Sequence, residues 1–243
     1  MSELNRIALL IDCDNVSHNS IEGVIEELSK FGKVNVRHAH GDWNSKSLSG
    51  WIERLHPHAI RPMQQFAYTK GKNATDSAMI IDAMDLLYGK TVDAFALMTS
   101  DSDFTPLVMR LLESGLPVYG FGEKKTPQPF VDACSTFIYT ENLANEKQDK
   151  GSGKPSAKAK KGKAKLRQDA ALVKLLRNAV EQTSGDDDWA LMSNVGKYIS
   201  NNSSFSPVNY GYIKLGELIR ATELFETEMR NDGKSLYIKD VRN

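Results

Sequence analysis

Apolar positions along the first 145 residues follow two alternating patterns, which predict strands and helices in turn. Continuous apolar runs at 6–11 and 93–99 are typical of strands buried on both faces. Residues 21–31 instead repeat apolar side chains at helical spacing, and 75–88 is apolar on nearly every side, which predicts a buried helix. The same patterns predict further strands at 33–40, 59–64, 116–121 and 136–139, and further helices at 46–55 and 106–113. Strands alternating with helices indicate an α/β fold with a doubly wound, mostly parallel sheet.

The pattern changes after residue 145. Residues 147–165 are dominated by Gly, Ser, Pro, Ala and Lys, with no apolar side chain larger than Ala, so we expect a flexible linker. Three helical patterns follow at 171–181, 190–199 and 215–222, and two strand patterns, 225–229 and 235–241, flank the turn signal Asn231-Asp232-Gly233. Three helices and a terminal hairpin predict a small winged-helix domain. The predicted organisation is therefore a domain at 1–145, a basic flexible linker at 146–168 and a second domain at 169–243.

The net charge of zero conceals an uneven distribution. Residues 1–145 carry a net charge of −5, residues 146–168 carry +7 and residues 169–243 carry −2. An acidic domain beside a basic segment suggests that one part attracts a polyanion while another handles cations. No apolar run is long enough to span a bilayer, and the first residues lack the pattern of a signal peptide. With only Cys13 and Cys134, both in apolar stretches, we expect reduced core cysteines, a cytoplasmic protein and no membrane partner.

Acidic residues stand where predicted strands end. Asp12 and Asp14 close the first strand, Asp76 opens helix 75–88, and Asp101 and Asp103 follow strand 93–99. The carboxyl ends of neighbouring parallel strands meet at one crevice, so these carboxylates should converge. Their mutual repulsion would be relieved by a divalent cation, and oxygen ligands without a Cys/His set favour Mg²⁺ or Mn²⁺. Such a site suits hydrolysis of a phosphodiester bond.

Other carboxylates have simpler interpretations. Strand alternation points Asp14 away from Asp12, so a role in a turn is as good an interpretation as a role in the site. Asp82 lies six residues after Asp76 and thus on another helix face, and we interpret Asp82, Asp85 and Asp93 as structural.

Specific motifs accompany these residues: Ala8-Leu-Leu-Ile-Asp-Cys-Asp-Asn15, Lys72-Asn-Ala-Thr-Asp76 and Thr99-Ser-Asp-Ser-Asp-Phe104. Together with Gly41-Asp-Trp43 and the segment 119–127, they resemble the NYN domain family, the PIN-like nuclease group that includes LabA-like proteins. The resemblance implies a PIN-like fold and metal-dependent cleavage of RNA. It also implies that the catalytic and metal-binding positions are Asp12, Asp76, Asp101 and Asp103, with Asn15 as the polar residue after the first strand.

The second domain resembles the OST-HTH (LOTUS) family, mainly through Trp189, Phe205 and Tyr210-Gly211-Tyr212. The resemblance implies a winged helix associated with RNA binding, and protein contacts in some members. From the residues, Lys197, Tyr210 and Lys214 are candidate RNA contacts, although the net charge of −2 argues against a strong grip on phosphate. In the first domain, Lys72 and Lys124 are candidates because ammonium groups attract phosphates.

The combined prediction is an Mg²⁺- or Mn²⁺-dependent ribonuclease with an RNA-binding second domain, acting on single-stranded or structured RNA. Two alternatives stay open. One is a non-catalytic RNA-binding adaptor that keeps the acidic pocket. The other is a haloacid-dehalogenase-like phosphatase with Asp12 as nucleophile and Asp14 as acid, which leaves Asp76 without a role. The sequence also leaves open whether the chain forms a homodimer.

Overall fold

The computed structural model describes residues 5–65, 74–143, 160–230 and 233–242. The chain divides into two compact units, Met1–Lys154 and Pro155–Asn243, and each is described by itself.

The first unit is built on a six-stranded sheet in the order β3-β2-β1-β4-β5-β6. Every neighbouring pair of strands is parallel. The predicted doubly wound sheet is therefore confirmed. The strands are β1 (Arg6–Asp12), β2 (Lys33–Gly41), β3 (Arg61–Gln64), β4 (Ala94–Met98), β5 (Val118–Gly122) and β6 (Thr136–Tyr139).

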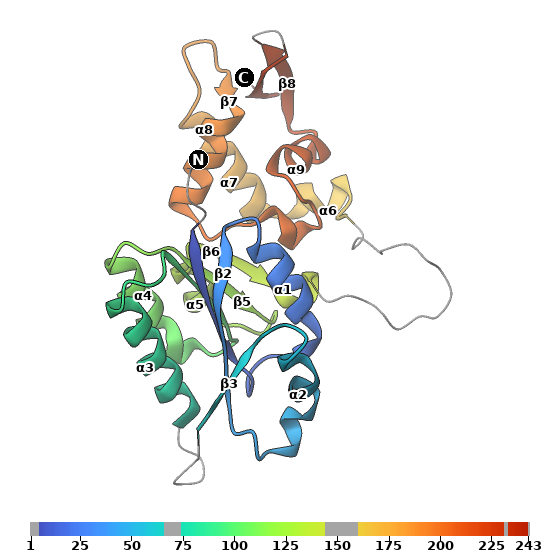
Figure 1. Ribbon diagram of the computed structural model, residues 1–243. Coiled ribbons are helices and arrows are strands. Elements are labelled where there is room, and N and C mark those ends of the chain that lie inside the picture. Colours follow the sequence, from blue (N-terminus) through green and yellow to red (C-terminus); the bar gives the residue numbers. More distant parts are fainter. Residues whose placement is uncertain (1–4, 66–73, 144–159, 231–232, 243) are drawn as a thin grey trace. The chain divides into compact units, whose positions relative to one another are not determined.

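Helices cover both faces of this sheet (Figure 1). On one face lie α1 (Ile21–Leu28) and α2 (Ser49–Leu55), and on the other lie α3 (Ala74–Tyr88), α4 (Thr105–Glu113) and α5 (Gln128–Ala133). On the α3–α5 face, Leu10 and Leu97 from the sheet pack with Met79, Val108 and Phe130 from the helices. The sequence pattern did not predict α5, which is only six residues long and begins next to Pro127.

The prediction that 75–88 forms a helix is confirmed by α3, but the prediction that this helix is buried is wrong. Met79 and Ala83 are fully buried against the sheet, whereas Ile81 is 61% exposed and Tyr88 is 69% exposed. A sheet face covers only one stripe of a helix that packs on it, so apolar residues on the other side of α3 remain at the surface.

The strand order places a topological switch point between β1 and β4. From β1 the chain winds outward through β2 to β3, and from β4 it winds the other way through β5 to β6. In open α/β sheets, the crevice outside the carboxyl ends of two such strands is where ligands bind. Asp12 is the last residue of β1, and Thr99 directly follows β4.

The second unit is a winged helix, as predicted. It contains α6 (Lys163–Gln168), α7 (Ala170–Glu181), α8 (Met192–Asn202) and α9 (Leu215–Thr222). A three-stranded antiparallel sheet in the order β7-β9-β8 completes it, with β7 (Ala190–Leu191), β8 (Phe225–Arg230) and β9 (Ser235–Asp240). Helix α8 begins at Met192 rather than at the predicted 190, because residues 190–191 pair with β9. The predicted turn residues Asn231 and Asp232 lie outside the described residues.

The predicted flexible linker, 146–168, needs a correction at its end. Residues 163–168 form α6, and Leu166 is fully buried in the core of the second unit. The backbone N–H of Lys161 donates to the carbonyl of Tyr210 (3.2 Å), and the Tyr212 hydroxyl donates to the carbonyl of Lys161 (2.9 Å). One buried leucine thus anchors a segment whose composition predicted a linker. Residues 146–159 lie outside the described residues.

Cys13 and Cys134 are free and buried, as expected. Within the described parts of the chain, no helix is both long and apolar enough to cross a membrane.

Candidate active site

Asp12 ends β1 at the switch point and is fully buried. Its Oδ2 accepts two hydrogen bonds, from the Thr99 hydroxyl at 2.7 Å and from Nδ2 of Asn15 at 2.8 Å. Its Oδ1 is buried and has no hydrogen-bond partner among the described residues. Burial raises the pKa of Asp12 above its ordinary value, and the charge of Asp14 adds to the rise; the hydrogen bonds from Thr99 and Asn15 and from the backbone of Asp14 oppose it. Asp12 therefore has one oxygen fixed by the protein and one left without a partner.

Thr99 connects the ends of the two central strands. Because Ile11 pairs with Met98, the residues that follow, Asp12 and Thr99, are neighbours across β1 and β4. The Thr99 hydroxyl donates to Asp12 and accepts from the backbone N–H of Asp101 at 3.1 Å. Thr99 was not predicted to be a site residue, although its place at the end of the predicted strand 93–99 was a signal for that role.

The backbone after Thr99 positions the next carboxylates. Oδ1 of Asp101 accepts the backbone N–H of Asp103 at 2.9 Å, which caps the short 3-10 helix Ser102–Phe104. Helix α4 follows with Pro106 in its first turn. Thr105 is the first residue of α4, and its hydroxyl donates to the carbonyl of Ser102 at 2.6 Å.

Asp76 lies in the first turn of α3. The preceding residue, Thr75, donates its hydroxyl to Oδ2 of Asp14 at 3.2 Å, which connects the start of α3 to the loop after β1. Burial and four negative charges raise the pKa of Asp76 to about 6. In decreasing order, the charges come from Asp12, Asp101, Asp103 and Asp14. The predicted convergence of these carboxylates is thus visible in the electrostatics of Asp76.

This arrangement fits a hard cation. The donors are oxygens, the buried Oδ1 of Asp12 has no partner, and the surrounding charges repel one another. In the described part of the chain, however, no three of these carboxylates bring ligand atoms within 4.8 Å of one another. Like charges without a counter-charge keep apart, and a cation between them would draw them closer.

A second group that could hold a metal ion consists of His38, His40 and Asp82, whose ligand atoms all lie within 4.8 Å of one another. Oδ2 of Asp82 lies 2.7 Å from Nδ1 of His38 and 3.0 Å from Nε2 of His40. Burial would raise the pKa of Asp82, but the hydrogen bonds and charges of both histidines outweigh it and hold the pKa well below its usual range.

Asp82 was interpreted as structural from its sequence position, and its grouping with His38 and His40 was not predicted. The available signal was the spacing of His38 and His40, which places both on one face of β2. Asp82 lies on α3 about 9 Å along the helix axis from Asp76, at 1.5 Å per residue. The contact with β2 therefore also helps to fix the helix that carries Asp76. Asp93, by contrast, is structural as interpreted, because its two oxygens accept from the Arg6 guanidinium at 2.9 and 2.8 Å.

The predicted RNA contacts occupy different environments. Lys72 lies outside the described residues. Lys124 is exposed in the loop after β5, and Lys197 and Lys214 are exposed on the second unit. Tyr210 has packing contacts instead: its hydroxyl donates to Asp169 at 3.2 Å, and the Lys161 ammonium lies 4.2 Å from its ring centroid.

Comparison with known families decides the identity of the first unit. Residues 6–142, more than half of the chain, match the NYN domain. The chain belongs to the NYN domain family. Residues 166–237 match the OST-HTH/LOTUS domain, so the NYN domain is followed by an OST-HTH domain in the same chain.

Individual relatives of this NYN protein add little on function. An uncharacterized protein of Methanocaldococcus jannaschii is 27% identical over 122 residues, which cover 49% of this chain and 48% of that protein. The chain thus matches about half the length of this curated relative. A crystal structure of a protein of unknown function from Vibrio parahaemolyticus is 20% identical with a TM-score of 0.48, covering 57% of this chain and 94% of that one. The WlbA dehydrogenase of Bordetella pertussis, solved with NADH and UDP-GlcNAcA, is 14% identical with a TM-score of 0.33, covering 75% and 41%.

Proposed function

We propose that this NYN protein is a metal-dependent ribonuclease that hydrolyses RNA phosphodiester bonds and uses its OST-HTH domain to bind RNA. The observation that carries the proposal is the buried, unpartnered Oδ1 of Asp12 at the switch point, surrounded by the carboxylates that raise the pKa of Asp76. A buried oxygen without a partner is costly unless a ligand satisfies it.

Asp12, Asp76, Asp101 and Asp103 would hold Mg²⁺ or Mn²⁺, the cations that oxygen-only sites favour. When bound, the cation supplies charge that stabilises the transition state of phosphodiester hydrolysis. Asn15 and Thr99 position Asp12, because both donate to Oδ2 and leave Oδ1 free for the ligand.

The pKa of Asp76 predicts how RNA cleavage should depend on pH. At a pKa of about 6, this carboxyl holds its proton in mildly acidic solution and loses it at neutral pH. Cation binding requires the carboxylate form, so it competes with the proton. We therefore expect cleavage to fall below about pH 6, and a higher Mn²⁺ concentration to move that decline to lower pH.

The OST-HTH domain would raise the local concentration of RNA at the NYN domain, because tethering makes the second contact intramolecular. Both single-stranded and structured RNA are within this proposal. Protein contacts through the OST-HTH domain stay open beside it.

The test is incubation of end-labelled single-stranded RNA with the full chain and Mn²⁺, with the Asp101→Asn variant as the control. Cleavage by the wild type alone supports the proposal. RNA that is bound but left intact by both proteins would contradict it and favour the adaptor. An active phosphatase without RNA cleavage would favour the haloacid-dehalogenase-like alternative.

A further inference from the structure

An open groove of about 650 Å³ lies along α7 in the OST-HTH domain. Its lining includes four cationic side chains, Arg167, Lys174, Arg177 and Arg242, and one acidic side chain, Glu181. Ala170 and Val173 provide an apolar strip on the same helix. The domain from 169 onward carries a net charge of −2, so this concentration of positive charge is local.

Three of the four cations are held in place by the domain itself. Asp240 is 5% exposed, and its Oδ2 lies 3.1 Å from Nε of Arg177 and 2.9 Å from a terminal guanidinium nitrogen of Arg242. One carboxylate thus forms ion pairs with two guanidinium groups, without a hydrogen bond to Nε of Arg177, and leaves an excess of positive charge.

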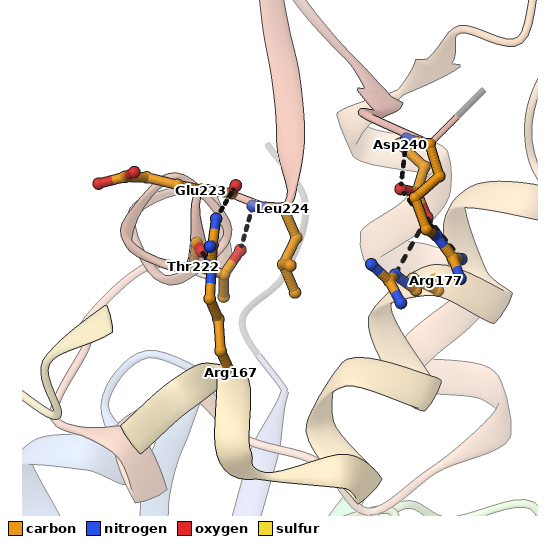
Figure 2. Close-up of polar contacts among 7 residues, drawn as sticks. Arg167, Arg177, Thr222, Glu223, Leu224 and Asp240 are labelled. Carbon is orange, nitrogen blue, oxygen red and sulfur yellow. Dashed lines mark hydrogen bonds and ion pairs between the residues drawn. The ribbon is translucent and has the colours of Figure 1, made fainter. Parts of the chain in front are cut away.

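Arg167 is fixed in a different way, by the end of α9. Its Nε donates to the carbonyl of Thr222 at 2.7 Å, and another guanidinium nitrogen donates to the carbonyl of Glu223. Figure 2 shows Arg167 directed at this helix end and Arg177 beside Asp240. Lys174 is exposed and has no hydrogen-bond or ion-pair partner among the described residues. The groove therefore combines preorganised cations with one free ammonium group.

The opposite charge pattern surrounds the β8–β9 hairpin. Arg230 lies 2.9 Å from Asp187 and 3.1 Å from Glu228, and Lys239 lies 3.0 Å from Asp188. The cations of these strands are thus paired with carboxylates, and Glu226 is exposed on β8. Because these cations are already paired, this surface offers phosphates less unpaired positive charge than the α7 groove does.

We infer that the α7 groove binds the sugar-phosphate backbone of a single RNA strand, with phosphates at Lys174 and the guanidinium groups and a sugar or base over Ala170 and Val173. This inference rests on the proposed RNA binding by the OST-HTH domain and moves its contacts away from Lys197 and Lys214. Guanidinium groups suit phosphate because they donate several hydrogen bonds in a planar fork. Contacts of this kind position a strand without selecting its sequence.

The test is fluorescence anisotropy of a labelled oligouridylate with the full chain in EDTA, across a range of salt concentrations. The double variant Lys174→Gln/Arg242→Gln removes two groove charges, and Lys197→Gln/Lys214→Gln removes two exposed charges that do not line the groove. We expect the groove variant to bind more weakly and its log–log salt slope to become shallower by about 1.4 units, at about 0.7 per phosphate contact. The control variant should keep the wild-type slope.

A second variant guards against an effect on folding, because Arg242 also pairs with Asp240. Ala170→Glu places a negative charge in the groove, at the first residue of α7, where a carboxylate stabilises a helix. It should weaken RNA binding with no loss of thermal stability. Wild-type binding by both groove variants, or an equal loss in the control, would overturn the groove while the chain still bound RNA. Displacement of the RNA by a glutamate peptide of equal charge would overturn it in favour of an acidic protein segment. Absence of any RNA binding by the wild type would remove both this inference and the RNA-binding part of the proposed function.

Discussion

The acidic crevice of the NYN domain and the basic α7 groove of the OST-HTH domain treat charge in opposite ways. In the crevice, Asp12 is fixed on one oxygen only, and burial together with nearby negative charges raises the pKa of Asp76. In the groove, Asp240 and the carbonyls at the end of α9 hold the cations. The groove is therefore stable without a ligand and keeps an excess of positive charge.

This difference indicates what each region lacks. The crevice lacks a balancing positive charge: burial and negative charges raise the pKa of Asp76, and Oδ1 of Asp12 has no partner within the described residues. The groove needs no ligand for stability, so its excess charge affects affinity more than folding. Ligand removal should therefore change the stability of the NYN domain more than that of the OST-HTH domain.

The largest expected effect is on catalysis. Asp12→Asn, Asp76→Asn and Asp101→Asn should each lower RNA cleavage at least 1000-fold, about 4 kcal/mol in barrier height, because an amide keeps the shape but removes the charge that binds a dication. Cleavage of labelled RNA in Mn²⁺ measures this, with Asp85→Asn, an exposed carboxylate on the same helix, as the control. Retained cleavage in two of the three variants would remove the site assignment.

The next largest expected effect is on the stability of the OST-HTH domain, and it tests where that domain begins. Leu166→Ala removes a fully buried side chain and should destabilise this domain by about 3 kcal/mol while leaving the NYN domain unchanged. Differential scanning calorimetry should show one transition move and the other stay. Lys165→Ala, at the exposed neighbouring residue, is the control. An unshifted transition in Leu166→Ala would mean that α6 is not part of the folded domain.

Deleting residues 146–243 should have a smaller effect. The NYN domain has its own core and should still cleave RNA with Mn²⁺, but its apparent affinity should fall about tenfold because the tethered contact is gone. Cleavage rates at a series of RNA concentrations measure the change. An unchanged apparent affinity at low salt would show that the OST-HTH domain is not an RNA-binding module in this chain.

The smallest expected effect is on the free energy of unfolding in the absence of metal. Because the pKa of Asp76 is raised from 3.8 to about 6, the folded chain binds more protons than the unfolded chain between these values, and stability falls as the pH rises through this window. Asp76→Asn should remove that loss and gain about 1 kcal/mol at neutral pH in EDTA, allowing for solvent screening of a partly exposed group. Below this window there should be no gain. Urea denaturation at both pH values measures it, and a gain that is equal in acid would contradict the electrostatic cause.

The sequence predicted the fold correctly where a single hydrophobic pattern determined a strand or a helix. Apolar runs located β1 and β4, whose ends carry Asp12 and lead to Asp101, and the charges of both residues act on Asp76. Prediction failed where a single residue changed the outcome. Leu166 anchors a lysine-rich segment to the OST-HTH core, and no average over composition reveals one buried leucine.

The polar partners within the sites were also hidden. Thr99 gains its role from Asp12 on the neighbouring strand, and His38 and His40 gain theirs from Asp82 on α3. The spacing of the two histidines places them on one face of β2 but does not identify the side chain that meets them. Likewise, Asp240 joins two arginines that lie 65 residues apart in the chain, Arg177 and Arg242. Pattern analysis finds the elements, whereas the pairing of charges depends on how those elements pack.

The most direct test of the central claim is a measurement of Mn²⁺ binding to the full chain by electron paramagnetic resonance at neutral pH. Asp12→Asn changes the crevice, and His38→Gln changes the other group that could hold a metal ion. The account predicts that Asp12→Asn abolishes Mn²⁺ binding together with RNA cleavage, while His38→Gln retains both. Loss of Mn²⁺ binding in His38→Gln with full binding in Asp12→Asn would contradict it, because the cation would then be held by His38, His40 and Asp82 rather than by the acidic crevice.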